Sequence, residues 1–225
     1  MVSDPSNPNS ISGRSRAHRF HCFLERAAAL HFKAASLLDI GGTVRYWTDR
    51  AALIPTGMFR SIDVANLDIS EMTSMENGMT IRAYRGDARI RTSFRQARYD
   101  VVFSNAVLEH VGNLGAQKEM ADAIRAAGRY YFVQTPAKRF PLEPHFYVPF
   151  FPYLPLRLQT ALHRNFDLGF MKKNPDWLGA RIDCENTRLL GYAELASLFD
   201  DGEIIKERLF GLCKSYIVTN MSLPR

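Results

Sequence analysis

An acidic residue followed by paired glycines is the clearest sign of ligand binding in this 225-residue sequence. Asp39 lies near the end of the apolar run 36–40, and Gly41, Gly42 and Thr43 follow it. Glycines let a backbone approach a ligand closely. A phosphate loop would carry Lys and Ser/Thr after its glycines, and a dinucleotide loop would read G-x-G-x-x-G. Because neither pattern is present, the acid at this bend favours a nucleoside-type ligand.

Further polar or small residues follow later apolar runs at regular intervals. They lie at the ends of the runs 59–67, 79–84 and 99–103 or just after them. These residues are Asn66, Asp68, Asp87, Ala88, Ser104, Asn105 and Ala106. The carboxyl ends of parallel strands meet at one edge of a sheet, where ligands bind in open α/β folds. The sequence therefore predicts that these residues surround one site.

The elements that must position them alternate between strand and helix. We predict five parallel strands over 36–40, 59–67, 79–84, 99–103 and 129–134, because each is followed by a turn or a helical pattern. Helices are predicted over 17–35, 43–53, 115–127 and 191–200, and two final strands over 203–210 and 214–219 form an antiparallel hairpin.

Four of these segments together resemble a known family. The motifs DIGGT, ANLD, GDA and YDVVFSNAVLEHV occur in the order and spacing of class I S-adenosylmethionine-dependent methyltransferases, and TPAKRFPLEPH resembles their type 11 group. The resemblance covers roughly residues 36 to 219. It implies an α/β fold with a seven-stranded Rossmann-like sheet, helices on both faces and an aromatic insertion before the last helix.

The resemblance also implies a role for each site residue. Asp39 would orient the turn of Gly41 and Gly42 and help hold the amino-acid part of the cofactor S-adenosylmethionine, although it could instead cap the next helix. Either Thr43 stands where the family has a glycine, or the turn is one residue shorter than in the family. Asn66 or Asp68 would bind the ribose hydroxyls. Asp87 would accept a hydrogen bond from the adenine amino group, although it could instead only form a turn, and the backbone of Ala88 would donate to the ring. Ser104, Asn105 and Ala106 would line the site near the sulfonium.

Two histidines are the candidates for a catalytic base. Histidine has an unperturbed pKa near 6.5, which suits the removal of a proton from a hydroxyl nucleophile. His145 begins the aromatic insertion, and His110 follows the fourth parallel strand. A structural role for each is the alternative, since many methyltransferases need no base.

The insertion over 135–190 is long for a connection inside a compact domain. Its first half is rich in proline and aromatic residues, and a helix is predicted over 156–166. Long connections of this kind commonly form lids or binding elements. We therefore predict a lid or acceptor-binding segment, which would also suit a lipid-like substrate or peripheral contact with a membrane. Packing of these aromatic residues onto the core is the alternative.

Composition limits the class of protein. The polar stretch 1–15 is predicted to be a disordered tail before one domain over 16–225, with no apolar signal core and no run long enough to span a membrane. Cys22, Cys184 and Cys213 show neither metal-ligand spacing nor a disulfide framework, which indicates the cytoplasm.

Net charge gives a weaker indication. The net charge is +6, and six arginines fall within residues 82–98. We interpret them as a solvated basic edge or as a surface for an anionic membrane or a phosphorylated substrate, since no nucleic-acid-binding motif accompanies them.

These observations predict a methyltransferase acting on a small-molecule, glycan-linked or lipid-linked acceptor. The alternative is a methyltransferase-like module that binds cofactor or partner without catalysis, which the short glycine turn motivates.

Overall fold

The structure is a computed structural model that describes residues 10–141, 146, 148–169 and 171–223. Within these residues, eight strands form one sheet in the order β3-β4-β2-β1-β5-β6-β8-β7. The strands are β1 Ala35–Ile40, β2 Phe59–Asn66, β3 Met72–Glu76, β4 Met79–Arg85, β5 Tyr99–Asn105, β6 Gly128–Pro136, β7 Glu203–Leu209 and β8 Leu212–Thr219. The helices are α1 Ile11–Ala29, α2 Val44–Thr48, α3 Leu114–Ala127, α4 Leu156–Asn165, α5 Trp177–Glu185 and α6 Tyr192–Leu198, with short 3₁₀ turns η1 Ala51–Leu53, η2 Arg91–Ser93, η3 Leu108–His110 and η4 Phe151–Tyr153.

The centre of the sheet is parallel and its two edges are antiparallel. Strands β4, β2, β1, β5 and β6 run in the same direction, which confirms the five predicted parallel strands. Strands β7 and β8 form the predicted antiparallel hairpin beside β6. The predicted number of seven strands is wrong, because β3 pairs antiparallel with β4 across a turn at Asn77 and Gly78. Both turn residues have positive φ, as a tight hairpin turn requires.

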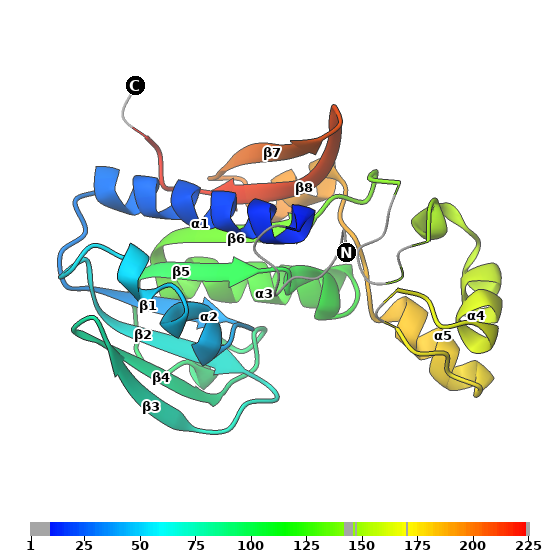
Figure 1. The fold of residues 1–225 in the computed structure, drawn as a ribbon, viewed down its shortest axis with the longest axis horizontal. Coiled ribbons are helices and arrows are strands. Elements are labelled where there is room, and N and C mark those ends of the chain that lie inside the picture. The colour runs from blue at the N-terminus through cyan, green and yellow to red at the C-terminus, as the bar shows by residue number, and fades with distance from the viewer. Residues whose placement is uncertain (1–9, 142–145, 147, 170, 224–225) are drawn as a thin grey trace.

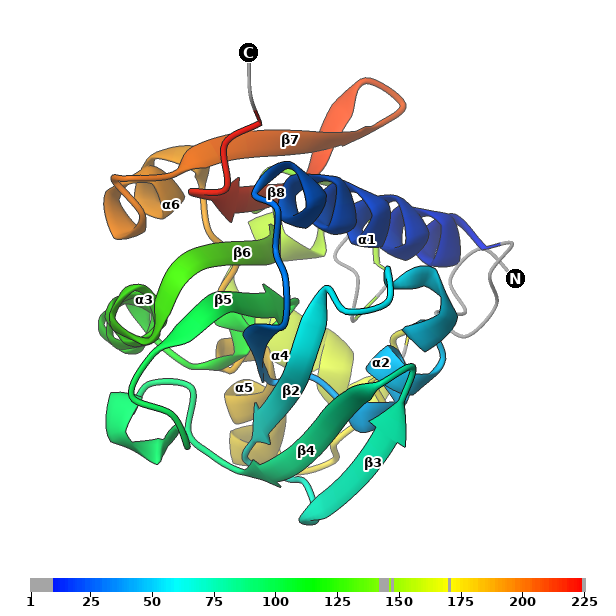
Figure 2. The ribbon, with the colours of Figure 1, turned by 90° about the vertical axis from the view of Figure 1, so that its left-hand side faces the viewer.

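Helices cover both faces of the sheet (Figure 2). On one face, α1 and α2 bury Phe23 and Trp47 against β1, β2, β5 and β6. On the other face, α3 and α6 bury Met120 and Leu195. Strand β1, sandwiched between these layers, is buried at all six positions. This is the three-layer arrangement expected of a parallel sheet with crossover helices.

Two predicted boundaries at the N-terminal end are wrong. Ser10 caps α1 by accepting a hydrogen bond from the Gly13 amide, at 2.9 Å, so the helix begins at Ile11 and not at residue 17. Residues 11–15 are therefore helical and not part of a disordered tail, while residues 1–9 lie outside the described residues. The helix ends at Ala29, because the chain turns through positive φ at His31 and Ala34 before entering β1.

The predicted insertion forms a lobe beyond the carboxyl ends of the parallel strands (Figure 1). We call residues 148–185 the lobe. It contains η4, the predicted α4 and the unpredicted α5. Phe151, Leu168 and Cys184 of the lobe form a small separate core with Phe146, which precedes the lobe in the chain. The aromatic residues of the segment thus pack partly with one another and not onto the sheet.

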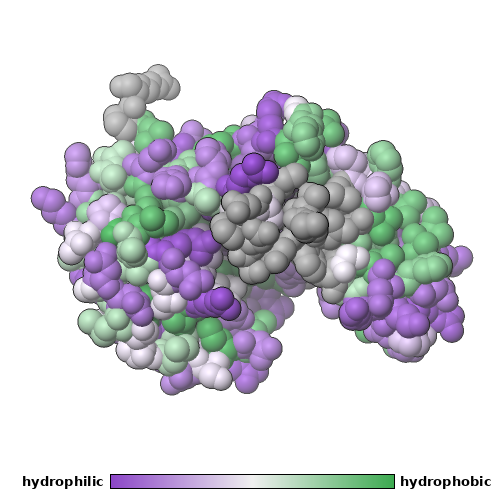
Figure 3. Space-filling model, viewed as in Figure 1, coloured by the Kyte–Doolittle hydropathy of each residue, from purple (hydrophilic) through white to green (hydrophobic). Residues whose placement is uncertain are grey.

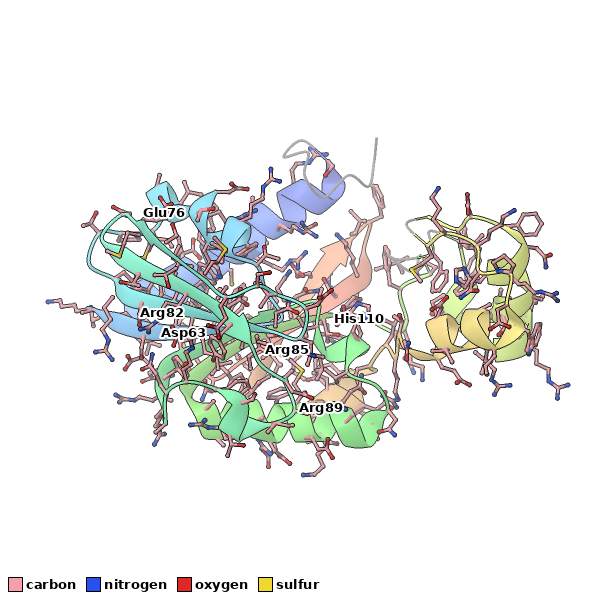
Figure 4. All side chains as sticks on the ribbon, turned by 90° about the horizontal axis from the view of Figure 1, so that it is seen from below. Asp63, Glu76, Arg82, Arg85, Arg89 and His110 are labelled. Carbon is pink, nitrogen blue, oxygen red and sulfur yellow. The ribbon has the colours of Figure 1, made fainter. Side chains whose placement is uncertain are left out.

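Three of the six arginines in the stretch 82–98 form ion pairs among the described residues, and Arg91 donates to a backbone carbonyl. Arg82 pairs with the buried Asp63 at 2.7 Å, and Arg95 pairs with Glu71 at 3.3 Å. Figure 4 shows Asp63 and Arg82 set back along the sheet, away from the lobe, with Arg89 and His110 nearer to it. Much of the charge in this stretch is therefore used within the fold.

Candidate active site

A cavity of about 440 Å³ opens at the carboxyl ends of β1, β2, β4 and β5. Its walls come from the turns that follow these four strands, which the parallel pairing of the strands brings to one edge. The lining residues are Gly41, Ala65, Asn66, Leu67, Gly86, Asp87, Ala88, Arg89, Ala106, Val107, His110 and Val111. The volume and the mixture of apolar walls with a few polar groups are those of a small-molecule site.

The glycine turn after β1 is shaped by its packing. Gly41 has φ +77°, and a Cβ added there would lie 2.4 Å from Val107 Cγ2. A Cβ at Gly42 would lie 1.7 Å from Asp39 Oδ2. Both positions therefore need glycine because neighbouring side chains occupy the space, and Gly41 also needs it for its backbone conformation. Thr43 accepts a hydrogen bond from the Tyr46 amide, at 3.3 Å, and so begins α2.

Asp39 is buried beneath this turn. Its Oδ2 accepts a hydrogen bond from Trp47 Nε1 at 2.7 Å. Burial raises the pKa of Asp39 from 3.8 to about 7, although the indole hydrogen bond opposes part of that rise. Removing a carboxylate from water disfavours its charged form. Asp39 therefore packs beneath the turn, and its carboxyl group binds a proton up to about neutral pH.

Asn66 supports the same turn from the side. Its Nδ2 donates to the carbonyl oxygens of Gly41, at 3.2 Å, and Gly42, at 3.0 Å, while its Oδ1 accepts from the Asp68 amide at 3.2 Å. The amide donors are thus committed to the turn, and one acceptor lone pair of Oδ1 is left. The side chain of Asp68 is exposed outside the cavity.

Asp87 lies in the cavity wall and is paired with Arg89. The guanidinium donates to both carboxylate oxygens, at 3.0 Å from Nε to Oδ1 and 2.7 Å from Nη2 to Oδ2, and the Arg89 amide donates to Oδ1 at 2.9 Å. These hydrogen bonds lower the pKa of Asp87 below its usual value. The carboxylate is consequently ionised and fixed in orientation at neutral pH.

The three residues that end β5 and follow it have different surroundings. Ser104 is buried, and its hydroxyl donates to the Ile40 carbonyl at 3.1 Å. Asn105 accepts a hydrogen bond from the buried Arg19, which also donates to Gln134 Oε1 at 2.7 Å. Ala106 has φ +57° and lines the cavity. The strained backbone at Ala106 therefore marks the point where the chain turns to face the site.

Of the two candidate bases, His110 is among the described residues and lines the cavity. It belongs to η3, and its Nε2 lies 4.0 Å from Oε1 of the buried Glu109. The other oxygen of Glu109 accepts from Thr135 Oγ1 at 3.1 Å, which ties η3 to β6. His145 lies outside the described residues.

A second cavity, of about 470 Å³, lies between the strand tips and the lobe. It begins where the first one ends along the chain, since His110 and Val111 line the first and Gly112 and Asn113 line the second. Its remaining wall is part apolar and part charged, and is formed by Lys138, Phe146, Phe151, Pro152, Gln159, Cys184, Glu185, Thr187, Arg188 and Leu189. The lobe thus completes a second compartment next to the first.

Comparison with known proteins identifies the family. The family model described as a methyltransferase domain matches residues 13–200, which is most of the chain. The chain belongs to the class I S-adenosylmethionine-dependent methyltransferases. This confirms the class I resemblance and the α/β fold predicted with it, while membership of the narrower type 11 group stays a prediction.

Solved structures of methyltransferases share the fold at low sequence identity. An O-methyltransferase family protein from Burkholderia thailandensis aligns with a TM-score of 0.53 and 11% identity over 92% of this chain, which spans only 55% of that protein. Magnesium protoporphyrin IX methyltransferase from Synechocystis PCC 6803, crystallised with bound S-adenosylmethionine, aligns with a TM-score of 0.50 and 11% identity over 95% of this chain and 84% of its own. The N-methyltransferase NodS from Bradyrhizobium japonicum WM9 gives 0.50 and 10% over 96% and 97%. No curated protein sequence is significantly similar to this methyltransferase.

The structure brings about half of the predicted site residues to the cavity wall. Gly41, Asn66, Asp87, Ala88, Ala106 and His110 line it, whereas Asp39, Gly42, Thr43, Asp68, Ser104 and Asn105 lie behind it or outside it. Sequence reasoning missed Arg89, which holds Asp87, and Trp47, which holds Asp39. The position of Arg89 two residues after an acid in a turn was a usable signal, and Trp47 gave none.

Proposed function

We propose that this methyltransferase binds S-adenosylmethionine in the cavity at the strand tips and transfers its methyl group to an acceptor in the second cavity. The observation that carries the proposal is the gathering of Gly41, Asn66, Asp87 and Ala106 from four separate strand ends around one space of about 440 Å³. In parallel α/β sheets this is the place where ligands bind.

The residues present fit the cofactor. Asp87, ionised and in the wall, would accept a hydrogen bond from the adenine amino group, with Ala88 beside it. Asn66 would offer Oδ1 to a ribose hydroxyl. The turn of Gly41 and Gly42 would face the amino-acid part. Leu67 and Val107 supply apolar contact for the flat base and its sugar.

The chemistry asks little of the side chains. The bound sulfonium supplies an electrophilic methyl group, and transfer is an in-line displacement that depends on alignment and on exclusion of water. His110 lies where the two cavities meet along the chain, so it can accept a proton from an acceptor hydroxyl. His145 is the second candidate for this role.

The second cavity suggests an acceptor with both an apolar and a polar part. Phe151, Pro152 and Leu189 provide the apolar wall, and Lys138 and Glu185 provide charged groups. This mixture supports a small-molecule, glycan-linked or lipid-linked acceptor. No nucleic-acid partner is proposed, because half of the arginines in the basic stretch 82–98 pair with carboxylates of the fold and no nucleic-acid-binding motif accompanies them.

We also propose that the protein works in the cytoplasm. The cysteines Cys22, Cys184 and Cys213 are free thiols. Such thiols persist in a reducing compartment. Among the described residues, none of the helices has the length and apolar character needed to cross a bilayer.

Calorimetric titration with S-adenosylhomocysteine tests the cofactor site. We expect saturable binding to the wild type and a loss of ~1–3 kcal/mol in binding free energy for Asp87→Ala, because a charge-assisted hydrogen bond is removed. Asp68→Ala is the matched control, since it removes an exposed carboxylate outside the cavity. Failure of the folded wild type to bind would refute the proposal. Binding without turnover on any acceptor would instead favour a cofactor-binding module.

A further inference from the structure

Among its described residues the lobe exposes seven large apolar side chains, of which four lie in or next to η4 and α4 and three, Trp177, Leu178 and Ile182, lie in α5. Phe150, Tyr153, Leu158 and Phe166 are 62%, 55%, 46% and 58% exposed, and we call them the lobe face. The rings of Phe150 and Tyr153 lie side by side, with centroids 6.5 Å apart. Figure 3 shows hydrophobic residues gathered over the part of the lobe where η4 and α4 lie. Large apolar side chains gathered on a surface mark a site of interaction.

The backbone keeps one of these rings exposed. Phe150 has φ +63°, a left-handed conformation that bulky residues rarely adopt. Its amide donates to the Pro141 carbonyl at 2.6 Å, which holds the turn in place. Strain of this kind persists at positions where the surrounding structure fixes it, and these positions are commonly functional.

The segment that carries the lobe face is basic. The segment 146–166 contains Arg157 and Arg164 and no aspartate or glutamate. Among the described residues of the lobe, three carboxylates pair with basic groups, namely Asp183 with His163, Asp167 with Lys172 and Glu185 with Arg181, and Asp176 caps α5 by accepting from the Gly179 amide. Within the part of the chain that the structure describes, the Arg164 side chain donates to one group, the backbone carbonyl of Pro175, at 3.0 Å. Both guanidiniums therefore remain available to an anionic partner.

The opposite side of the same segment faces the second cavity. Phe151, Pro152 and Gln159 line that cavity, and Thr160 and His163 are buried. The segment thus has one side for the interior and one for the surroundings. Whatever the lobe face contacts will lie on the outer side of the wall that separates it from the second cavity.

We propose that the lobe face docks on the surface of an anionic lipid bilayer. Helices that lie in a membrane interface combine apolar and aromatic side chains with arginine or lysine. Anionic headgroups attract such basic residues, and they repel acidic ones. The inference does not depend on the proposed methyl transfer, although docking would bring the second cavity next to lipid-borne molecules.

Co-sedimentation with vesicles tests this inference on the full chain. The probes are phosphatidylcholine vesicles with and without roughly one third phosphatidylglycerol. We expect the wild type to sediment with the anionic vesicles and to remain in the supernatant with the neutral ones. Arg157→Glu with Arg164→Glu should weaken binding by at least about 30-fold, because the loss of each basic side chain near the surface costs a factor of roughly five and the new carboxylates are repelled as well. Leu158→Glu should weaken it as well.

Two control variants separate the lobe face from general exposure and charge. Phe210→Ser removes an apolar ring that is 89% exposed at the β7–β8 turn. Lys33→Glu with Arg98→Glu makes the same change in net charge at exposed positions away from the lobe. Both controls should bind anionic vesicles like the wild type. Circular dichroism and S-adenosylhomocysteine binding establish that each variant is folded.

Four outcomes would overturn the inference. The first three are a folded wild type that does not bind anionic vesicles, lobe variants that bind as well as the wild type, and controls that weaken binding as much as the lobe variants. A fourth is a dimer in solution that Leu158→Glu dissociates, because the lobe face would then contact a second copy of the chain. None of these outcomes affects the titration that tests the cofactor site.

Discussion

Replacing Asp39 by asparagine would test how the ionisation of this residue affects the stability of the protein. Asparagine has the same shape as a protonated aspartate, and its Oδ1 can accept the hydrogen bond that Trp47 Nε1 donates at 2.7 Å. It also leaves the close contact with Gly42 unchanged in size. The substitution therefore removes one property only, the ability of this buried side chain to ionise.

The magnitude follows from the pKa of Asp39, which burial raises from 3.8 to about 7. Between these values the folded protein holds a proton that the unfolded chain has released, so stability falls as pH rises. Each pH unit in this window costs ~1.4 kcal/mol, and the window of about three units costs ~4 kcal/mol in total. The stability conferred by the proton is complete below about pH 4 and is lost once pH passes about 7.

Urea unfolding of both proteins from pH 4 to pH 8 measures this difference. We expect similar free energies of unfolding near pH 4 and an advantage for Asp39→Asn that grows to ~4 kcal/mol at pH 8. Subtracting the two curves cancels the titration of all other groups. Asp87→Asn is the control, because the pKa of Asp87 is lowered and its carboxylate stays ionised over most of this range. Parallel curves for the wild type and Asp39→Asn would refute the assignment of a raised pKa.

Three further substitutions probe the site. Arg89→Ala should weaken S-adenosylhomocysteine binding by up to about fivefold, because Asp87 loses the partner that orients it, and the pair is partly exposed; stronger binding in calorimetry would mean that Arg89 competes with the ligand. Gly42→Ala should destabilise the protein by ~1–3 kcal/mol in urea unfolding, since its Cβ would lie 1.7 Å from a carboxylate oxygen, whereas Gly191→Ala, whose nearest neighbour would be 3.5 Å away, should cost far less. His145→Ala should lower turnover about 100-fold with an acceptor that the wild type methylates, if this histidine is the base, and unchanged turnover would leave it a structural role.

Most of the sheet could be predicted because its central strands are almost wholly buried. Runs such as Leu37–Ile40 have few polar residues other than those that serve the site, and five parallel strands begin and end within about two residues of the predicted bounds. Strand β3 was missed because its residues are polar or exposed, as befits an edge. The Asn77-Gly78 pair was the available signal, since asparagine followed by glycine is typical of a two-residue hairpin turn.

The lobe was harder to predict for a related reason. Helix α5 buries two residues, Ala180 and Cys184, which lie four positions apart, so its apolar pattern is short. Trp177 and Leu178 obscure this pattern because they are apolar but exposed. Asp176 caps it by accepting from the Gly179 amide at 2.6 Å. An acid before a short helical pattern was therefore the stronger indication, and a small core of four buried residues gave no periodicity long enough to read.

At the site, the sequence indicated positions but not bonds. Asn66, Asp87 and Ala106 line the cavity because strand ends converge there whatever follows them. The hydrogen-bond partners of these side chains lie far away in the sequence, where a local pattern gives no information about them. Gly42, for example, lies 24 residues before Asn66. Arg89 is the exception, since it lies two residues from Asp87.

These bonds determine what the site can offer a ligand. Asp87 accepts three hydrogen bonds from Arg89, and a carboxylate has about four lone pairs, so one acceptor remains on Oδ2. Asn66 has used both amide hydrogens on the turn and keeps one lone pair on Oδ1. Each residue therefore presents a single acceptor in a fixed direction. An adenine amino group and one ribose hydroxyl match these two acceptors without displacing any bond of the protein, whereas a carboxylate in place of Asn66 could accept from both hydroxyls but could not hold the glycine carbonyls. In the proposed cofactor complex, the amide would thus give up one contact with the ligand in return for a rigid turn.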